Sequence, residues 1–192
     1  MFQTDGETAS RGTAGTGRSV AWGGLLLTFA LALAYVESCI PFFFGVPGMK
    51  LGLPNLAVVL LLFRRNDGGK NGRARAVRDA AMVNILRIVL AGFLFGSLFG
   101  ILFSLAGAFF SLAVMVWLMH TGRFGVTGVS IAGGVAHNAA QLAVAVFLVK
   151  TSGILYYAPF LLLAGTLTGA LIGLTAGAVL VRIPVEKQEE EK

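Results

Sequence analysis

The chain has 192 residues, of which 56% are apolar and 12% are charged, and its formal net charge at pH 7 is +6. Soluble domains have roughly 45–50% apolar and about 25% charged residues, whereas the mean hydropathy of this chain is +0.82. This composition excludes a soluble globular enzyme, a disordered chain and a nucleic-acid-binding protein. Because a membrane span needs about 20 apolar residues, we expect an all-α membrane protein, a compact bundle of about six transmembrane helices over residues 20–181.

Taken in order, residues 1–19 are rich in Gly, Thr and Ser and predict a flexible cytoplasmic tail. The first apolar run, Val20 to Ile40, resembles a signal peptide, but Glu37 near its end and five later apolar stretches favour a retained span. A basic loop, Arg64 to Arg78, follows the second span, and residues 182–192 form a charged cytoplasmic tail. The later predicted spans are Leu51–Phe63, Asp79–Phe95, Leu98–Met119, Val126–Val149 and Tyr156–Val181.

The basic residues predict the orientation of the bundle. With six spans and both termini inside, twelve of the 15 basic residues fall in cytoplasmic segments. Lys50 and Lys150 fall in outer loops, and Arg87 falls within a span. Cytoplasmic loops carry the excess of Lys and Arg in membrane proteins, so we predict a multi-pass protein of the plasma membrane with both termini in the cytoplasm.

Two sets of glycines recur every four residues, which places each set along one side of a helix. Such stripes let helix backbones approach closely in lipid. We favour a packing role over a sliding surface between moving helices. The first set is Gly165, Gly169, Gly173 and Gly177, and the second, which crosses a predicted turn, is Gly92, Gly96 and Gly100.

A small group of polar residues interrupts the apolar spans, where charged groups are costly and usually face a bundle interior, a cavity or a partner. His137 and Gln141 are four residues apart and share a helix face, with Asn138 about 100° around. One interpretation is that the group satisfies itself, for instance through Glu37 with Lys50 or Arg87. The other is an outward ligand pocket. The candidate ligand-binding residues are Glu37, Lys50, Asn55, Arg87, His137, Asn138 and Gln141.

Two motifs in this group resemble a known family. They are the run Glu37–Pro41 with Val46–Asn55, which includes Pro-Gly-Met-Lys-Leu-Gly, and the pair His137-Asn138 with Gln141. Together they are similar to the signature of the Gx transporter family, also named heptaprenyl diphosphate synthase component I. Over about residues 20–181, further matches are Arg87, Gly92, Ser104, Gly107, Ser111, Met115, Val129, Ser130, Gly133, Gly134, Tyr157 and Pro159.

That family is similar in size and helix number to the substrate-binding S components of energy-coupling factor (ECF) transporters. The resemblance implies a small-molecule substrate, a transmembrane coupling protein and ATPase subunits as partners. Small residues on the first helix of S components meet the coupling protein, which marks Ala30 and Ala34 as candidate partner contacts. A ligand site of aromatic and polar groups, covered by the loop from Pro41 to Asn55, suits a vitamin-, quinone- or flavin-like compound.

The synthase name implies an alternative, a membrane accessory subunit of heptaprenyl diphosphate synthase in menaquinone side-chain biosynthesis. Prenyl-chain elongation holds diphosphates through Mg²⁺ and needs clustered carboxylates, but Glu37, Asp67 and Asp79 are scattered. We therefore expect no catalytic residue, no cofactor and no metal. The sequence has no G-x-x-x-x-G-K-[ST] loop for ATP and no charged ring of a channel. An independent ion-coupled carrier using Glu37 or His137 stays open.

Overall fold

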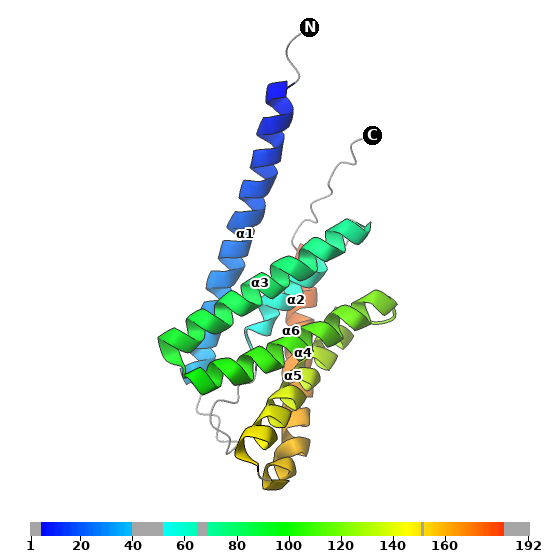
Figure 1. The fold of residues 1–192 in the computed structure, drawn as a ribbon. Helices are drawn as coiled ribbons and strands as arrows, with labels where there is room; N and C mark the ends of the chain where they lie inside the picture. Colours follow the sequence, from blue (N-terminus) through cyan, green and yellow to red (C-terminus); the bar gives the residue numbers. More distant parts are fainter. Residues whose placement is uncertain (1–4, 40–51, 65–68, 151, 183–192) are drawn as a thin grey trace.

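The computed structural model describes residues 5–39, 52–64, 69–150 and 152–182, and every regular element in these ranges is helical (Figure 1). This confirms the predicted all-α fold, and α5 has the predicted bounds. The elements in chain order are α1 (Asp5–Cys39), α2 (Asn55–Arg64), α3 (Gly69–Phe95), α4 (Leu98–Thr121), α5 (Val126–Val149), the 3-10 helix η1 (Ser152–Tyr157) and α6 (Ala158–Arg182).

Among the described residues, four helical segments are long and apolar enough to cross a membrane. They are Val20–Cys39, Leu98–Thr121, Val126–Val149 and Gly153–Arg182. Four of the six predicted spans are thus supported. The helix α2 is apolar but has only 10 residues, and the apolar half of α3 carries Asp79 and Arg87.

Helices that follow one another in the chain run in opposite directions. Near the middle of α1 the guanidinium of Arg64, at the end of α2, lies 4.0 Å from the ring centroid of Trp22. Near the end of α1, Tyr35 stacks edge-on against Phe95 of α3, with 5.5 Å between ring centroids. The helix α1 is therefore antiparallel to α2 and parallel to α3, and it begins at the end of the bundle where α6 finishes (Figure 1).

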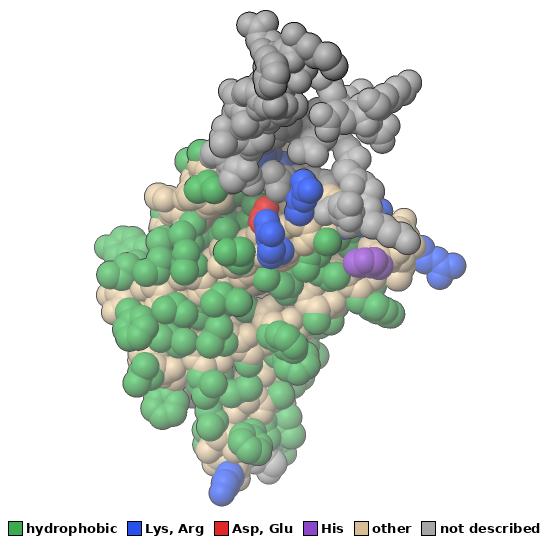
Figure 2. Space-filling view, turned by 45° about the horizontal axis from the view of Figure 1, so that its top comes forward, with side chains coloured by type: hydrophobic (Ala, Val, Ile, Leu, Met, Phe, Trp, Pro, Cys, Tyr) green, Lys and Arg blue, Asp and Glu red, His purple; other side chains and the backbone are tan. Residues whose placement is uncertain are grey.

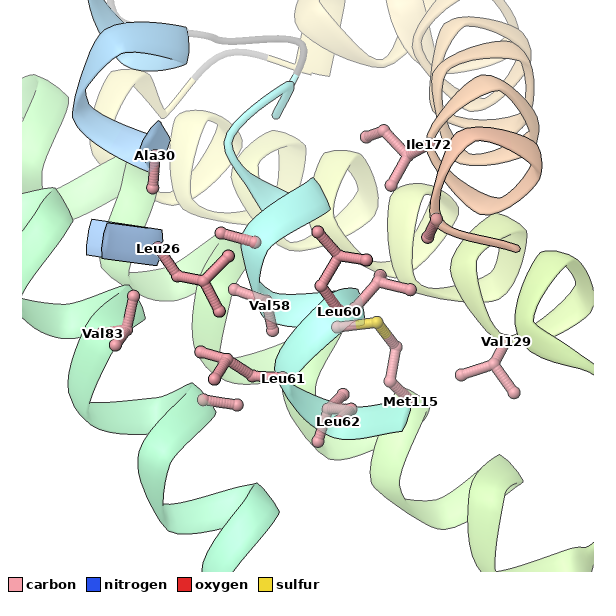
Figure 3. Packing of buried hydrophobic residues seen from close by; sticks show 14 of the residues in the cluster. Leu26, Ala30, Val58, Leu60, Leu61, Leu62, Val83, Met115, Val129 and Ile172 are labelled. Carbon is pink, nitrogen blue, oxygen red and sulfur yellow. The ribbon is translucent and has the colours of Figure 1, made fainter. Parts of the chain in front are cut away.

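The centre of the bundle is α2. Pro54 precedes its first residue, a position where the missing proline N–H costs nothing. Val58, Val59 and Leu62 are almost fully buried, as expected for a helix that is apolar on all sides. Figure 3 shows α2 among side chains from its neighbours, for example Leu26 of α1. The other labelled residues of this cluster are Ala30, Leu60, Leu61, Val83, Met115, Val129 and Ile172.

The glycines of α6 pack on α5 with almost no space between the backbones. A Cβ atom at Gly165 would lie 2.7 Å from the carbonyl oxygen of Gly134. At Gly169 it would lie 2.7 Å from the Cα of Ile131, and at Gly173 2.6 Å from the Cα of Thr127. Three of the four predicted glycines therefore form a close helix–helix contact.

The remaining predicted glycines behave differently. Nothing lies within 4 Å of a Cβ at Gly177. In the second set, Gly92 faces the side chain of Ile101 in α4, while Gly96 lies in the turn between α3 and α4 and Gly100 approaches the hydroxyl of Ser97. The second set is therefore not one continuous packing face.

Two predicted boundaries are wrong. The helix α1 begins at Asp5, so residues 5–19, predicted to be a flexible tail, are helical; they contain no proline, and elongating an existing helix adds a hydrogen bond per residue. The helix α3 begins at Gly69, inside the predicted loop from Arg64 to Arg78. Alanine and arginine favour helix, and Ala76 is buried against the bundle.

Large apolar side chains cover much of the exposed surface, as expected for helices that face lipid. Examples are Phe109 and Trp117 of α4, Phe147 of α5 and Phe160 of α6, all more than half exposed. In Figure 2 hydrophobic side chains cover much of the visible described surface, and most of the visible charged side chains lie toward one end. This distribution is compatible with a multi-pass membrane protein.

Candidate functional site

The structure brings six of the seven candidate ligand-binding residues into the interior. They come from four helices: Glu37 from α1, Asn55 from α2, Arg87 from α3 and the others from α5. Lys50 and most of the predicted covering loop lie outside the described residues. The exposed fractions of the six side chains are Glu37 5%, Asn55 6%, Arg87 5%, His137 3%, Asn138 2% and Gln141 0%.

A turn before α2 connects three of these helices. The backbone N–H of Gly52 donates to Oε1 of Glu37 at 2.5 Å. Gly52 has a φ of +85°, in the left-handed region that glycine adopts at little cost. A Cβ there would lie 3.0 Å from Nδ2 of Asn55 and 3.7 Å from Cδ2 of His137. Glycine at this position therefore lets α1, the start of α2 and α5 meet.

Two neighbouring groups favour the charged form of Arg87. Its Nη2 donates to Oδ1 of Asn84, one turn earlier in α3, at 2.5 Å. The guanidinium is also attracted by the carboxylate of Glu37, which is one of the two pairings that the sequence suggested. The attraction between Glu37 of α1 and Arg87 of α3 lowers the cost of burying both charges in the bundle.

The imidazole of His137 packs directly on the backbone of α4. A Cβ at Gly107 would lie 2.6 Å from Cε1 and 2.7 Å from Nδ1 of the ring. One turn away, a Cβ at Gly133 would lie 3.2 Å from Oγ of Ser111. Since α4 and α5 are antiparallel, the same register places Ser104 at the level of Gln141.

Sequence reasoning left Ser104, Gly107 and Ser111 out of the candidate site. All three are buried in α4. The signal was present in their spacing of three and four residues, which puts small and polar groups on one face of an apolar helix. That face lies against α5.

Asn138 links α5 to α6. Its Nδ2 donates to the backbone carbonyl of Leu161 at 2.7 Å, and a Cβ at Gly165 would approach the same nitrogen to 3.0 Å. The hydrogen bond fixes the orientation of the amide, so that Oδ1 is left as an acceptor. Nδ2 of Asn138 thus joins two helices, whereas Oδ1 has no partner among the described residues.

Six buried polar atoms have no hydrogen-bond partner among the described residues. Leaving a buried donor or acceptor unpaired costs about 1–3 kcal/mol, and a lipid environment supplies no water to relieve it. The Gln141 amide is unpartnered at both ends. The six atoms are Nε of Arg87, Oγ of Ser111, Nδ1 of His137, Oδ1 of Asn138, and Nε2 and Oε1 of Gln141.

The two candidate partner contacts are internal in this structure. Ala30 is 1% exposed and packs in the hydrophobic cluster around α2, and Ala34 is 4% exposed. Their small side chains allow α1 to approach the rest of the bundle, and a contact of this part of α1 with a coupling protein stays a prediction. The outward side of α1 instead presents Leu25, Phe29 and Val36.

Residues 26–179 match the family described as heptaprenyl diphosphate synthase component I. The chain belongs to this family. The matched range begins within α1 and ends within α6, and it includes every candidate residue of the buried polar cluster. No curated protein and no solved structure matches the chain.

Proposed function

We propose that this chain is the membrane-embedded substrate-binding subunit of a small-molecule uptake transporter, similar to the S component of an ECF transporter. The observation that supports this role is the set of buried polar atoms without partners on α3, α4 and α5. Polar groups at such depth are expensive and commonly mark a substrate path. A ligand that pairs with them gives a physical reason for their presence.

The surroundings of the polar cluster fit a vitamin-, quinone- or flavin-like compound. Small-molecule sites are mainly apolar, with a few placed polar groups that fix orientation. Here the polar groups of His137 and Gln141 lie within an apolar bundle whose central helix is α2. We include Lys50 in the proposed site as a cation for a carbonyl or an anionic group of the ligand.

Partners and location form part of the same proposal. The chain has no nucleotide-binding loop of the G-x-x-x-x-G-K-[ST] type, so active uptake requires ATPase subunits and a coupling protein. We place the protein in the plasma membrane with both termini in the cytoplasm, on the charge distribution. In this role the chain binds substrate and is not itself an enzyme.

The family description favours a second candidate, an accessory membrane subunit of heptaprenyl diphosphate synthase. A component can act by holding a catalytic partner or a lipid product at the membrane without carrying out the reaction. The two candidates differ in what binds and in which partner is needed, so one set of preparations distinguishes them.

The experiment is purification of the full chain from its native membrane, followed by mass spectrometry of the small molecules that copurify. We expect a stoichiometric compound that is lost from Gln141→Ala and retained in Gly177→Ala, a control in which the new Cβ meets nothing within 4 Å. A preparation without any bound compound, which raises prenyltransferase activity of a soluble partner, contradicts the transporter proposal and supports the accessory role.

A further inference from the structure

The unpartnered atoms of the polar cluster differ in what they need from a ligand. Nε of Arg87 carries a hydrogen and must donate. Oδ1 of Asn138 must accept, because its Nδ2 already donates to the carbonyl of Leu161 at 2.7 Å. Gln141 offers one donor and one acceptor side by side, whichever way its amide is turned. The described part of the cluster therefore needs both acceptors and donors from a ligand.

Arg87 already has two described neighbours that favour its charged form. The cation of Arg87 is attracted by the carboxylate of Glu37, and its Nη2 donates to Asn84. An added anion would compete with Glu37, and an added cation would be repelled by Arg87. An uncharged ligand disturbs neither group.

We infer that the ligand of this site is an uncharged molecule with a hydrogen-bond donor and an acceptor on neighbouring atoms, as in an amide, a lactam or an imide. The inference rests on the proposed binding function and narrows it. The amide of Gln141 pairs with such an edge through two parallel hydrogen bonds, and Asn138 Oδ1 accepts from a further donor. His137 Nδ1 and Ser111 Oγ can serve in either sense.

Two other classes fit the cluster less well. A quinone and an ionised diphosphate offer only acceptors. Either would satisfy Arg87 Nε but would leave Oδ1 of Asn138 and Oε1 of Gln141 without a partner. A buried acceptor that stays unpaired on binding reduces affinity. A diphosphate would also need several cations, whereas Arg87 is the one cation among the described residues of the cluster and is attracted by Glu37.

The test uses the full chain in phosphatidylcholine nanodiscs and three probes. Lumichrome is uncharged and has an imide edge, menadione is uncharged with acceptors only, and farnesyl diphosphate is an anion with acceptors only. Thermal melting and equilibrium dialysis give stabilisation and affinity for each. The matched variants are Ser111→Ala, which removes an unpartnered hydroxyl of the cluster, and Ser130→Ala, which removes the hydroxyl of a buried serine whose Cβ faces Gly173 of α6.

We expect lumichrome alone to raise the melting temperature. Its affinity should fall by roughly tenfold or more in Gln141→Leu and measurably in Ser111→Ala, but not in Ser130→Ala, since a tenfold loss corresponds to about one buried hydrogen bond. Stronger binding of menadione or farnesyl diphosphate, lost in Gln141→Leu, overturns the ligand class and leaves the binding function standing. No response to any probe also overturns the class, and the proposed function then depends on its own test of copurified compounds.

Discussion

The contact between α5 and α6 makes a quantitative prediction for Gly169→Ala. The added Cβ would lie 2.7 Å from the Cα of Ile131 and 2.7 Å from the carbonyl oxygen of Ser130. Ordinary contact begins at 3.4 Å, so the helices must separate by about 0.7 Å. Both obstructing atoms belong to the backbone and cannot rotate away. Overpacking of this kind costs about 1–3 kcal/mol, and we expect the free energy of unfolding to fall by that amount.

The matched control is Gly177→Ala in the same helix, where nothing lies within 4 Å of the new Cβ. Alanine favours helix over glycine by up to about 1 kcal/mol, so this variant should be as stable as the wild type or more stable. Reversible unfolding in mixed micelles, followed by circular dichroism, measures both. Equal effects of the two substitutions would refute the close packing of α5 on α6.

Three further predictions follow from the polar residues and the charge distribution. Asn138→Ala should lower the free energy of unfolding by about 0.6–1 kcal/mol, because its hydrogen bond to α6 is lost. Gln141→Leu should leave the free energy of unfolding unchanged or raise it. Equal losses for the two variants in denaturant titrations would argue against a ligand role for Gln141. Glu37→Ala should lower the free energy of unfolding by up to about 3–5 kcal/mol, because the N–H of Gly52 loses its acceptor and Arg87 loses the attraction of the carboxylate. Glu37→Ala/Arg87→Leu should recover part of this loss in the same titration. In a cysteine-free background, a single cysteine within 65–78 should react with an impermeant reagent only after the cells are opened; reaction from outside would reverse the predicted orientation.

The sequence predicts the fold well where local and global signals agree. The apolar run of α5 begins after Gly125 and ends before Lys150, and its bounds are as predicted. The starts of α1 and α3 are missed because polar and basic residues in water carry no apolar periodicity, even where they are good helix formers. In both helices the polar segment continues the helix of the apolar segment that follows it in the chain, and composition alone does not reveal this.

The candidate site is predictable in its residue types and only partly in its contacts. Polar residues in apolar spans identify Glu37, Arg87 and Gln141, since their burial in lipid needs a reason. The same pattern does not reveal that the amide of Asn138 donates a hydrogen bond to α6, nor that the ring of His137 packs on Gly107. Those facts depend on the rotation of α4 and α6 against α5, which is set by packing across the whole interface.

The shortness of α2 connects the fold to the chemistry of the site. Ten residues extend about 15 Å, about half the hydrocarbon thickness of a bilayer. The helix therefore begins inside the bundle rather than at its edge, where its first N–H groups would find water. Turn hydrogen bonds cover three of them, the first from Asn55 to the carbonyl of Gly52.

Glu37 accepts the N–H of Gly52, which lies just before those turns. The same carboxylate attracts the guanidinium of Arg87. The buried acid of α1 thus has two structural roles among the described residues, one at the turn that precedes α2 and one beside Arg87. The atoms left for recognition are the neutral ones of α4 and α5 together with Nε of Arg87, which is why the site favours a ligand that donates and accepts hydrogen bonds over one that brings a charge.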